Sequence, residues 1–184
     1  GIECNWQPTD NTKPVGMVKK RLAGNQTILA YLRKVQAYNS YTVKPTLSAK
    51  RVGKVFKAHG GIQLTRNDKN IDFLFEVVRR EEEWEKKFSD RMKLYKDFYD
   101  NFVTMDCGYE RAPQLIIICE DDKHMAETFK IIIKNKLELD RIKLYFSTDL
   151  RQNQETLSNT LVEFKLDEAT NKYKMEEPTI KLLG

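Results

Sequence analysis

The clearest pattern of apolar and polar positions lies between residues 58 and 79, AHGGIQLTRNDKNIDFLFEVVR. Two alternating stretches flank the polar residues 67–70, which predicts an antiparallel β-hairpin. In the second strand, Phe73, Phe75 and Val77 share one face, and Asp72, Leu74, Glu76 and Val78 share the other. A carboxylate among apolar residues is costly unless it faces solvent or is paired. Glu76 is therefore the first candidate functional residue.

The next segment predicts a long helix over residues 80–101. Its apolar residues recur at steps of three and four, namely Trp84, Phe88, Met92, Tyr95, Phe98, Tyr99 and Phe102. We expect Glu81, Glu82 and Glu83 in the first turn, as a solvated start where negative charge suits the helix dipole. An earlier helical pattern covers residues 15–38, and Gly24 is expected to split or delay that helix.

The remaining patterns predict mostly strands. Residues 41–46 and 51–57 are short strands, the first at an edge because of Pro45. The apolar run QLIIIC, a helix beginning near Asp121 or Asp122 and the strand RIKLYFSTD form a βαβ unit with a parallel pair. At the end, LVEFKLD and KYKMEE flank EATN and predict a further hairpin.

This order of elements predicts an α/β fold of three layers, with a mixed central sheet flanked by helices. The same order occurs in the restriction-endonuclease-like core of PD-(D/E)XK nucleases, although order alone does not identify a fold family. We expect one domain over residues 1–184, with a core at 15–150 and a peripheral C-terminal hairpin within 151–184. The abrupt start without Met leads us to expect a fragment of a longer protein.

Composition adds a mild bias toward an anionic partner, because the net charge is +5 and the isoelectric point about 9.0. Three cysteines without a CxxC pair and only two histidines disfavour a zinc site. We expect Cys119 to be a buried free thiol, and reduced cysteines fit a cytoplasmic protein. No apolar run is long enough to cross a membrane, and no signal peptide opens the chain.

Local sequence resembles the replication-relaxation family of plasmid and mobile-element proteins. The resemblance is carried by FKAHGGIQLTRNDKNIDFLFEVVRREE, WEKKFSDRMKLYKDFY, PQLIIICEDDKHMAETFKIII and RIKLYFSTD, and it covers about residues 25–150. It implies a nuclease-like fold and a DNA-associated role in replication or mobilisation. Glu76 and Arg79 match the Glu and Arg of the family's second strand.

Two positions depart from the family pattern. His59 stands where the family has an acidic residue, and Val78 stands where it has Asp and where active nucleases of this fold have Lys. Mg²⁺ normally requires more than one carboxylate, and a cation must steady the attacking water or the phosphate. Catalysis is therefore expected to be lost or impaired. If activity remains, Glu76 would hold Mg²⁺ and Lys93, or else Lys87, would supply the missing lysine.

The same residues also suit simpler structural roles. Glu76 is expected to pair with Arg79, Arg80 or a lysine of the following helix, and His59 to face solvent in a turn. Arg79 and Arg80 are alternatively a phosphate-binding edge. Positive charge also crowds two neighbouring strands through Lys44, Lys50, Arg51, Lys54 and Lys57. These lysines and arginines either follow a nucleic-acid backbone or protect a sheet edge from aggregation.

The sequence thus predicts a DNA-binding, nuclease-like module of a plasmid or integrative-element protein, with impaired catalysis. The DNA-binding residues would be Lys50, Arg51, Lys54, Lys57, Arg79 and Arg80. Two alternatives remain, which are an active Mg²⁺-dependent endonuclease and a domain that binds protein partners of a mobile-element complex. No cofactor is expected in the impaired form.

Overall fold

The computed structural model describes residues 14–36, 42–46, 51–52, 56–102, 109–139, 142–153 and 160–176, and of residues 35–36, 43–46, 51–52, 56 and 66 the backbone alone. Its elements are α1 (Val15–Gln36), β1 (Thr42–Thr46), β2 (Arg51–Val52), β3 (Phe56–Lys57), β4 (Gly60–Arg66), β5 (Lys69–Val77), α2 (Trp84–Asp100), β6 (Gln114–Cys119), α3 (Asp122–Lys134), β7 (Leu144–Thr148), the 3₁₀ helix η3 (Arg151–Asn153), β8 (Glu163–Asp167) and β9 (Lys172–Glu176).

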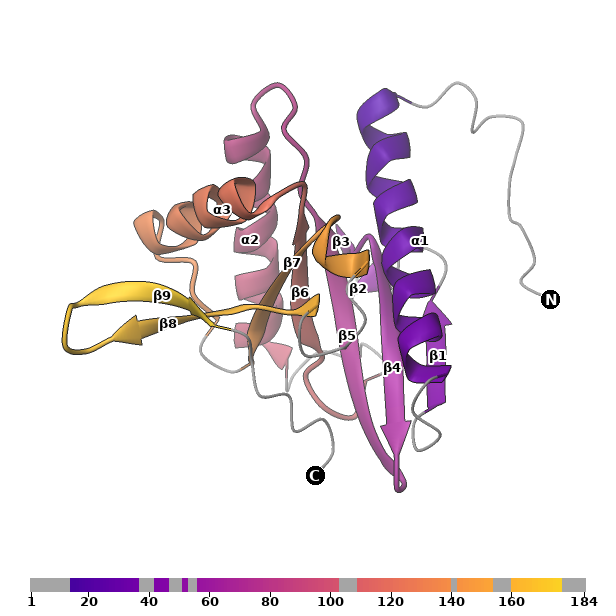
Figure 1. The fold of residues 1–184 in the computed structure, drawn as a ribbon. Coiled ribbons are helices and arrows are strands. Elements are labelled where there is room, and N and C mark those ends of the chain that lie inside the picture. Colours follow the sequence, from indigo (N-terminus) through magenta and orange to yellow (C-terminus); the bar gives the residue numbers. More distant parts are fainter. Residues whose placement is uncertain are drawn as a thin grey trace.

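Five strands form the central sheet in the order β1-β4-β5-β6-β7. The pairs β1–β4 and β4–β5 are antiparallel, whereas β5–β6 and β6–β7 are parallel. Helix α1 packs on one face of this sheet, and α2 and α3 pack on the other (Figure 1). The prediction of a three-layer α/β fold with a mixed sheet is confirmed, including the placement of residues 70–78 and 114–119 in one sheet.

The β4–β5 hairpin forms because its turn residues tolerate positive φ. Asn67 and Asp68 have φ values of 49° and 58°, and they alone connect the two strands. Two consecutive positive φ values match a two-residue turn whose twist suits antiparallel strands. The turn is therefore shorter than the four polar residues predicted, since Lys69 and Asn70 already pair with Arg66 and Thr65.

Alternate residues of β5 point to opposite faces of the sheet and contribute to the hydrophobic core on each face. Phe73, Phe75 and Val77 join the core under α1, where the ring of Phe75 lies 6.3 Å from that of Tyr31. Leu74 and Val78 join the core under α2 and α3. The predicted division of this strand into two faces is confirmed.

Helix α2 begins later than the acidic run that precedes it. Glu83 occupies the N-cap position with a left-handed backbone, φ 54°, so Glu81, Glu82 and Glu83 lie before the first turn. The prediction that they form the first turn was wrong. The buried face is the predicted one and consists of Phe88, Met92, Tyr95, Phe98 and Tyr99.

Gly24 does not interrupt α1. The helix is continuous through this residue, and a Cβ there would lie 3.2 Å from the carbonyl oxygen of His59. Glycine thus allows α1 to approach the start of β4 closely. The prediction that Gly24 would split or delay the helix was wrong.

The stretch 51–57 was predicted as one strand, but it forms two. Strands β2 and β3 pair with each other in a separate two-stranded sheet, with Arg51 opposite Lys57 and Val52 opposite Phe56. Strand β1 lies at the edge of the central sheet, as its proline predicted.

The hairpin β8–β9 is confirmed, and it extends away from the central sheet (Figure 1). The residues just before it are not peripheral, however. Val162 pairs with Phe146 of β7 through two backbone hydrogen bonds of 2.8 Å, and Thr160, Leu161 and Val162 are buried. The Nζ atom of Lys34 donates to the carbonyl of Gln152 and the hydroxyl of Thr160, which joins α1 to this segment.

Candidate functional site

Glu76 lies near the end of β5, beside a cleft of about 510 Å³. Side chains from α1, from the β4–β5 end of the sheet and from α2 line the cleft, including Lys20, His59, Arg79, Trp84 and Arg91. The carboxylate is nearly buried, with 3% of the residue exposed. A buried charge of this kind requires partners.

The main partner of Glu76 is Arg91, which was not among the predicted ones. The Nε atom of Arg91 donates to Oε1 at 3.1 Å, and its Nη2 atom donates to Oε2 at 2.6 Å. The hydroxyl of Tyr95, one helical turn later, donates to Oε2 at 3.0 Å. Two parallel bonds from a guanidinium are the strongest form of this ion pair. The predicted pairing of Glu76 with Arg79, Arg80 or a helix lysine was therefore wrong.

His59 completes the surroundings of Glu76. Its Nδ1 atom lies 3.3 Å from Oε2 of Glu76 and accepts a hydrogen bond from the backbone N–H of Val77 at 3.1 Å. The backbone N–H of His59 donates to Phe75, so the residue extends the pairing of β4 with β5 by both its main chain and its side chain. The expectation of a solvent-facing turn histidine was wrong, because 25% of the side chain is exposed and its ring is bonded.

These contacts fix the charge of Glu76. Burial alone would raise its pKa, but the proximity of His59 and the charge and hydrogen bonds of Arg91 lower the pKa to about 2. The carboxylate is thus ionised at neutral pH, and its oxygens face the donors of Arg91 and Tyr95. We conclude that this cluster, Glu76, Arg91, Tyr95 and His59, joins β5 to α2.

The residues around Glu76 do not fit a Mg²⁺ site. Mg²⁺ requires several hard oxygen ligands in octahedral geometry. Across the described part of the chain, no group of three or more His, Cys, Asp or Glu side chains is placed to hold a metal ion. Asp72, on the same face of β5, accepts from Gln63. Lys93 is 62% exposed and pairs with Asp90, and it does not line the cleft.

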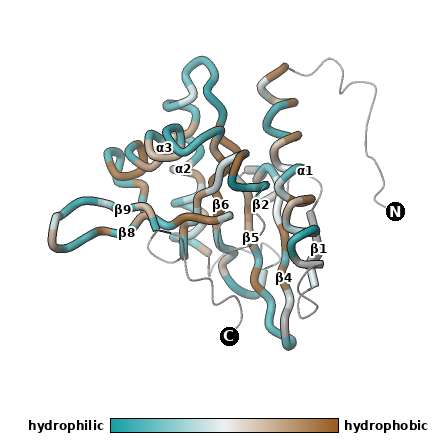
Figure 2. Tube along the Cα trace, viewed as in Figure 1, coloured by the Kyte–Doolittle hydropathy of each residue, from teal (hydrophilic) through white to brown (hydrophobic). Residues whose placement is uncertain are grey.

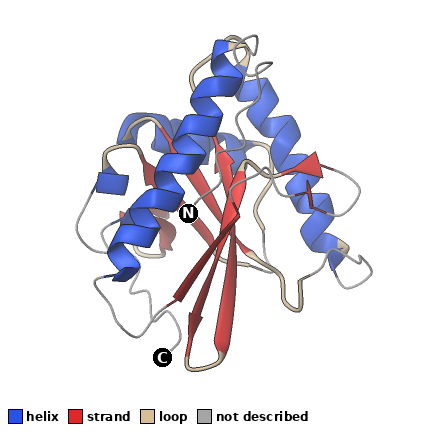
Figure 3. Cartoon of the chain, turned by 90° about the vertical axis from the view of Figure 1, so that its right-hand side faces the viewer, coloured by secondary structure: helices blue, strands red, loops and turns tan. Residues whose placement is uncertain are grey.

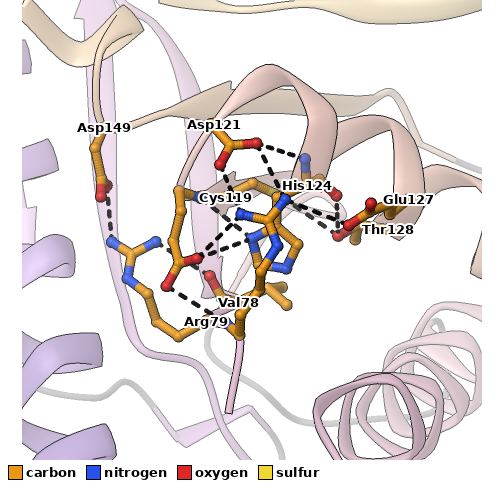
Figure 4. Close-up of polar contacts among 10 residues, drawn as sticks. Val78, Arg79, Cys119, Asp121, His124, Glu127, Thr128 and Asp149 are labelled. Atoms are coloured by element: carbon orange, nitrogen blue, oxygen red, sulfur yellow. Dashed lines mark hydrogen bonds and ion pairs between the residues drawn. The ribbon is translucent and has the colours of Figure 1, made fainter.

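Arg79 and Arg80 lie where the parallel strands end, next to carboxylates that follow β6 and β7 and one carboxylate of α3. Arg79 is 6% exposed and donates to Asp149 at 2.7 Å and to the carbonyl of Val78 at 3.1 Å (Figure 4). Arg80 contacts Glu120, Asp121 and Glu127. The hydrogen bond from Arg80, together with that from the backbone of His124, lowers the pKa of Asp121. The charges of both arginines are thus compensated within the protein.

Two further side chains at this end of the sheet are buried. Cys119 is a free thiol, as predicted, with its sulfur 3.6 Å from the hydroxyl of Thr128, and burial raises its pKa to about 12. His124 accepts from the backbone N–H of Glu120 at 3.3 Å, and its ring lies edge-on to Trp84 at 4.6 Å. Burial lowers the pKa of His124. Both residues pack α3 against the sheet.

The predicted basic strands are described in part. Lys50 and Lys54 lie outside the described residues, and of Arg51 only the backbone is described. Lys57 is exposed at the end of β3, directly opposite Arg51, and its carbonyl accepts from Arg91 at 2.8 Å. The structure thus brings residues 51 and 57 together.

Charge is distributed unevenly along the sequence. Residues 11–67 contain 12 Lys and Arg and no Asp or Glu, whereas the rest of the chain has 20 Lys and Arg and 27 Asp and Glu. The acid-free segment, residues 11–67, includes α1, β1, β2, β3 and β4. In Figure 1 these elements lie on the side of the molecule opposite α3 and the β8–β9 hairpin. The net charge of +5 is therefore the sum of a strongly basic segment and a remainder that is net acidic.

Comparisons with protein-family models, with curated proteins and with solved structures found no match. Among the described residues, no helix is both long and apolar enough to cross a membrane. The fold, the Glu76 cluster and the distribution of charge are thus the features that bear on function.

Proposed function

We propose that this chain is a DNA-associated module of a plasmid or integrative-element protein for replication or mobilisation, built on a restriction-endonuclease-like core and catalytically impaired. The order of elements, from α1 through the antiparallel strands to the β6-α3-β7 unit, supports such a core. The family and the mobile-element role rest on the resemblance over residues 25–150.

The main support for DNA binding is the composition of the acid-free segment. Twelve basic residues in 57 consecutive positions, with no acidic residue among them, concentrate positive charge in this part of the chain. Lys and Arg that neutralise phosphates release counterions, which drives binding without reading bases. A mixed charge of the ordinary kind would not create such a field.

Within this segment, Lys50, Arg51, Lys54 and Lys57 are assigned to the DNA backbone. The pairing of Arg51 with Lys57 across β2 and β3 supports a local concentration of charge. We assign Arg79 and Arg80 a smaller role in DNA binding than the sequence predicted, because carboxylates already neutralise their charges. They help to hold the carboxyl ends of the strands together.

Impaired catalysis is supported by the closed Glu76 cluster. A carboxylate that accepts from Arg91 and Tyr95 has oxygens committed to protein donors. Binding of Mg²⁺ there would require breaking a buried ion pair, which is costly. An active Mg²⁺-dependent nuclease is the alternative that this geometry disfavours.

The test is a fluorescence-anisotropy titration of labelled duplex and single-stranded DNA at several salt concentrations. A variant with Gln at positions 50, 51, 54 and 57 should bind at least about tenfold more weakly than the wild type, with a shallower salt dependence. A matched control carries Gln in place of Lys86, Lys123, Lys134 and Lys172, which are exposed outside the acid-free segment. The control has the same net charge and should bind nearly as the wild type does.

Three results would count against the proposal. Absence of binding at low salt would favour the alternative of a protein-interaction domain. Equal weakening in both variants would mean that only overall charge matters, and strong sequence preference would contradict a backbone-directed mode.

A further inference from the structure

Helix α1 has a second apolar face that does not contact the sheet. Its inner face places Ala23, Ile28 and Tyr31 in the core. Nine large apolar side chains are exposed in the described part of the chain, and five of them belong to α1, namely Val15 (70%), Met17 (55%), Val18 (36%), Leu22 (62%) and Leu29 (46%). Figure 3 shows α1 lying outside the sheet, and Figure 2 shows apolar residues along its length. A surface helix normally has polar residues on its outer face.

The exposed apolar residues follow the spacing of a helix–helix contact. Val15, Val18, Leu22, Asn25 and Leu29 are separated by three, four, three and four residues, which is the a/d repeat of a coiled coil. We call these five residues the outer seam. It spans about 21 Å along the helix axis, from the rise of 1.5 Å per residue. Asn25 is the polar member, and a polar residue at such a position fixes the register of a partner helix.

The charge beside the outer seam selects the partner. Helix α1 contains five Lys and Arg and no Asp or Glu. One row beside the seam consists of Lys19, Gln26 and Arg33, seven residues apart and all exposed. Residues in this position pair with opposite charges on the facing helix.

Other occupants fit less well. A second copy of α1 would bring basic rows together, which is unfavourable. Nucleic acid offers phosphates to the basic row but no apolar surface along a helix of this length. An anionic lipid surface favours a wide apolar face with aromatic residues, whereas the outer seam is narrow and contains none.

From this geometry we propose that the outer seam of α1 binds an acidic amphipathic helix of a partner protein. Leucine-type residues of the partner would pack between Val15, Val18, Leu22 and Leu29, and its acidic residues would face Lys19 and Arg33. This mode is the binding of a helix by an apolar seam with charged edges. The proposal does not depend on DNA binding, which is assigned to Lys50, Arg51, Lys54 and Lys57.

The test uses the full chain and two synthetic helices of about 21 residues, three heptads long. Both have Leu at positions a and d and one Asn to face Asn25. The acidic helix has Glu at positions e and g, and the basic helix has Lys there. Calorimetry should detect at least about tenfold tighter binding of the acidic helix.

Variants locate the site. Leu22→Gln and Leu29→Gln together should weaken binding of the acidic helix at least about tenfold, because both side chains are exposed and their loss leaves the core intact. Leu150→Gln is the control, since Leu150 is 72% exposed but lies after β7. A charge-reversed variant, Lys19→Glu with Arg33→Glu, should bind the basic helix in preference. DNA affinity of the seam variant should equal that of the wild type.

The proposal is overturned if neither helix binds, or if the acidic helix binds equally well after the seam substitutions. It is also overturned if sedimentation shows a dimer that the seam substitutions dissociate. Binding to vesicles of phosphatidylserine and phosphatidylcholine that the same substitutions abolish, without binding of the acidic helix, would assign the seam to a lipid surface instead.

Discussion

Arg91 of α2 donates two hydrogen bonds to the carboxylate of Glu76 on β5, at 3.1 and 2.6 Å. The pair links the sheet to the helix that covers it, and only 3% of Glu76 is exposed. Tyr95 and the carbonyl of Lys57 extend this link to the next turn of α2 and to the end of β3.

Loss of Arg91 should destabilise the fold strongly. Arg91→Ala leaves a buried carboxylate without its main partner, and we expect a loss of about 3 kcal/mol in the free energy of unfolding. Urea denaturation followed by circular dichroism measures it. Lys93→Ala, on the exposed side of the same helix, is the control and should change stability by less than about 0.5 kcal/mol. Similar values for both variants would mean that the pair contributes little.

The same pair should determine part of the acid sensitivity. The folded pKa of Glu76 is lowered from 4.5 to about 2, so its contribution to stability is complete above the ordinary value and declines as the pH falls through this interval. Unfolding free energies measured across these pH values should fall less steeply for Glu76→Gln than for the wild type. Parallel curves for the two proteins would contradict a lowered pKa.

Lys34 should affect stability at high pH. Burial lowers its pKa from 10.5 to about 8, so between these values the unfolded chain binds a proton that the folded chain has released. The contribution of Lys34 to stability should therefore become more favourable as the pH rises through this interval. The measurement is the difference in unfolding free energy between the wild type and Lys34→Met over this pH range. A constant difference would show that Lys34 keeps its ordinary pKa.

Gly61 should not accept a side chain. A Cβ at this position would lie 2.6 Å from the carbonyl oxygen of Phe73, a backbone atom of the paired strand β5. Gly61→Ala should therefore cost about 1–3 kcal/mol through displacement of the strands. Thermal unfolding compares it with Lys69→Ala, an exposed change in the same hairpin. If the two melt at the same temperature, the strands adjust freely and the contact is unimportant.

Cleavage of DNA by this chain should be negligible in Mg²⁺. The donors that surround Glu76 occupy its carboxylate, and Val78 supplies no cation at the position of the nuclease lysine. Incubation of supercoiled plasmid with the purified chain, resolved on an agarose gel, gives the answer. Cleavage that requires Mg²⁺ and disappears in Glu76→Ala would establish the nuclease alternative.

The elements that depend on local alternation could be predicted from the sequence. Apolar alternation and two turn residues that accept positive φ specify the β4–β5 hairpin, and steps of three and four specify the buried face of α2. The continuous apolar run at β6 indicated a strand covered on both faces. These patterns depend on residues that are close in sequence, so they can be interpreted without knowledge of the rest of the fold. The separation of charge was also present in the sequence, although net charge concealed it.

The partners of the charged residues could not be predicted from the sequence, because they come from elements that meet only in the folded protein. Glu76 pairs with Arg91, fifteen residues later, because α2 crosses β5 at that turn, and Arg79 reaches Asp149 from a strand two places away in the sheet. Gly24 lies within a continuous helix, at a position where a Cβ would lie 3.2 Å from the carbonyl oxygen of His59. Such contacts depend on the relative placement of whole elements. Periodicity gives the face on which a side chain lies but not the residue of another element that it meets.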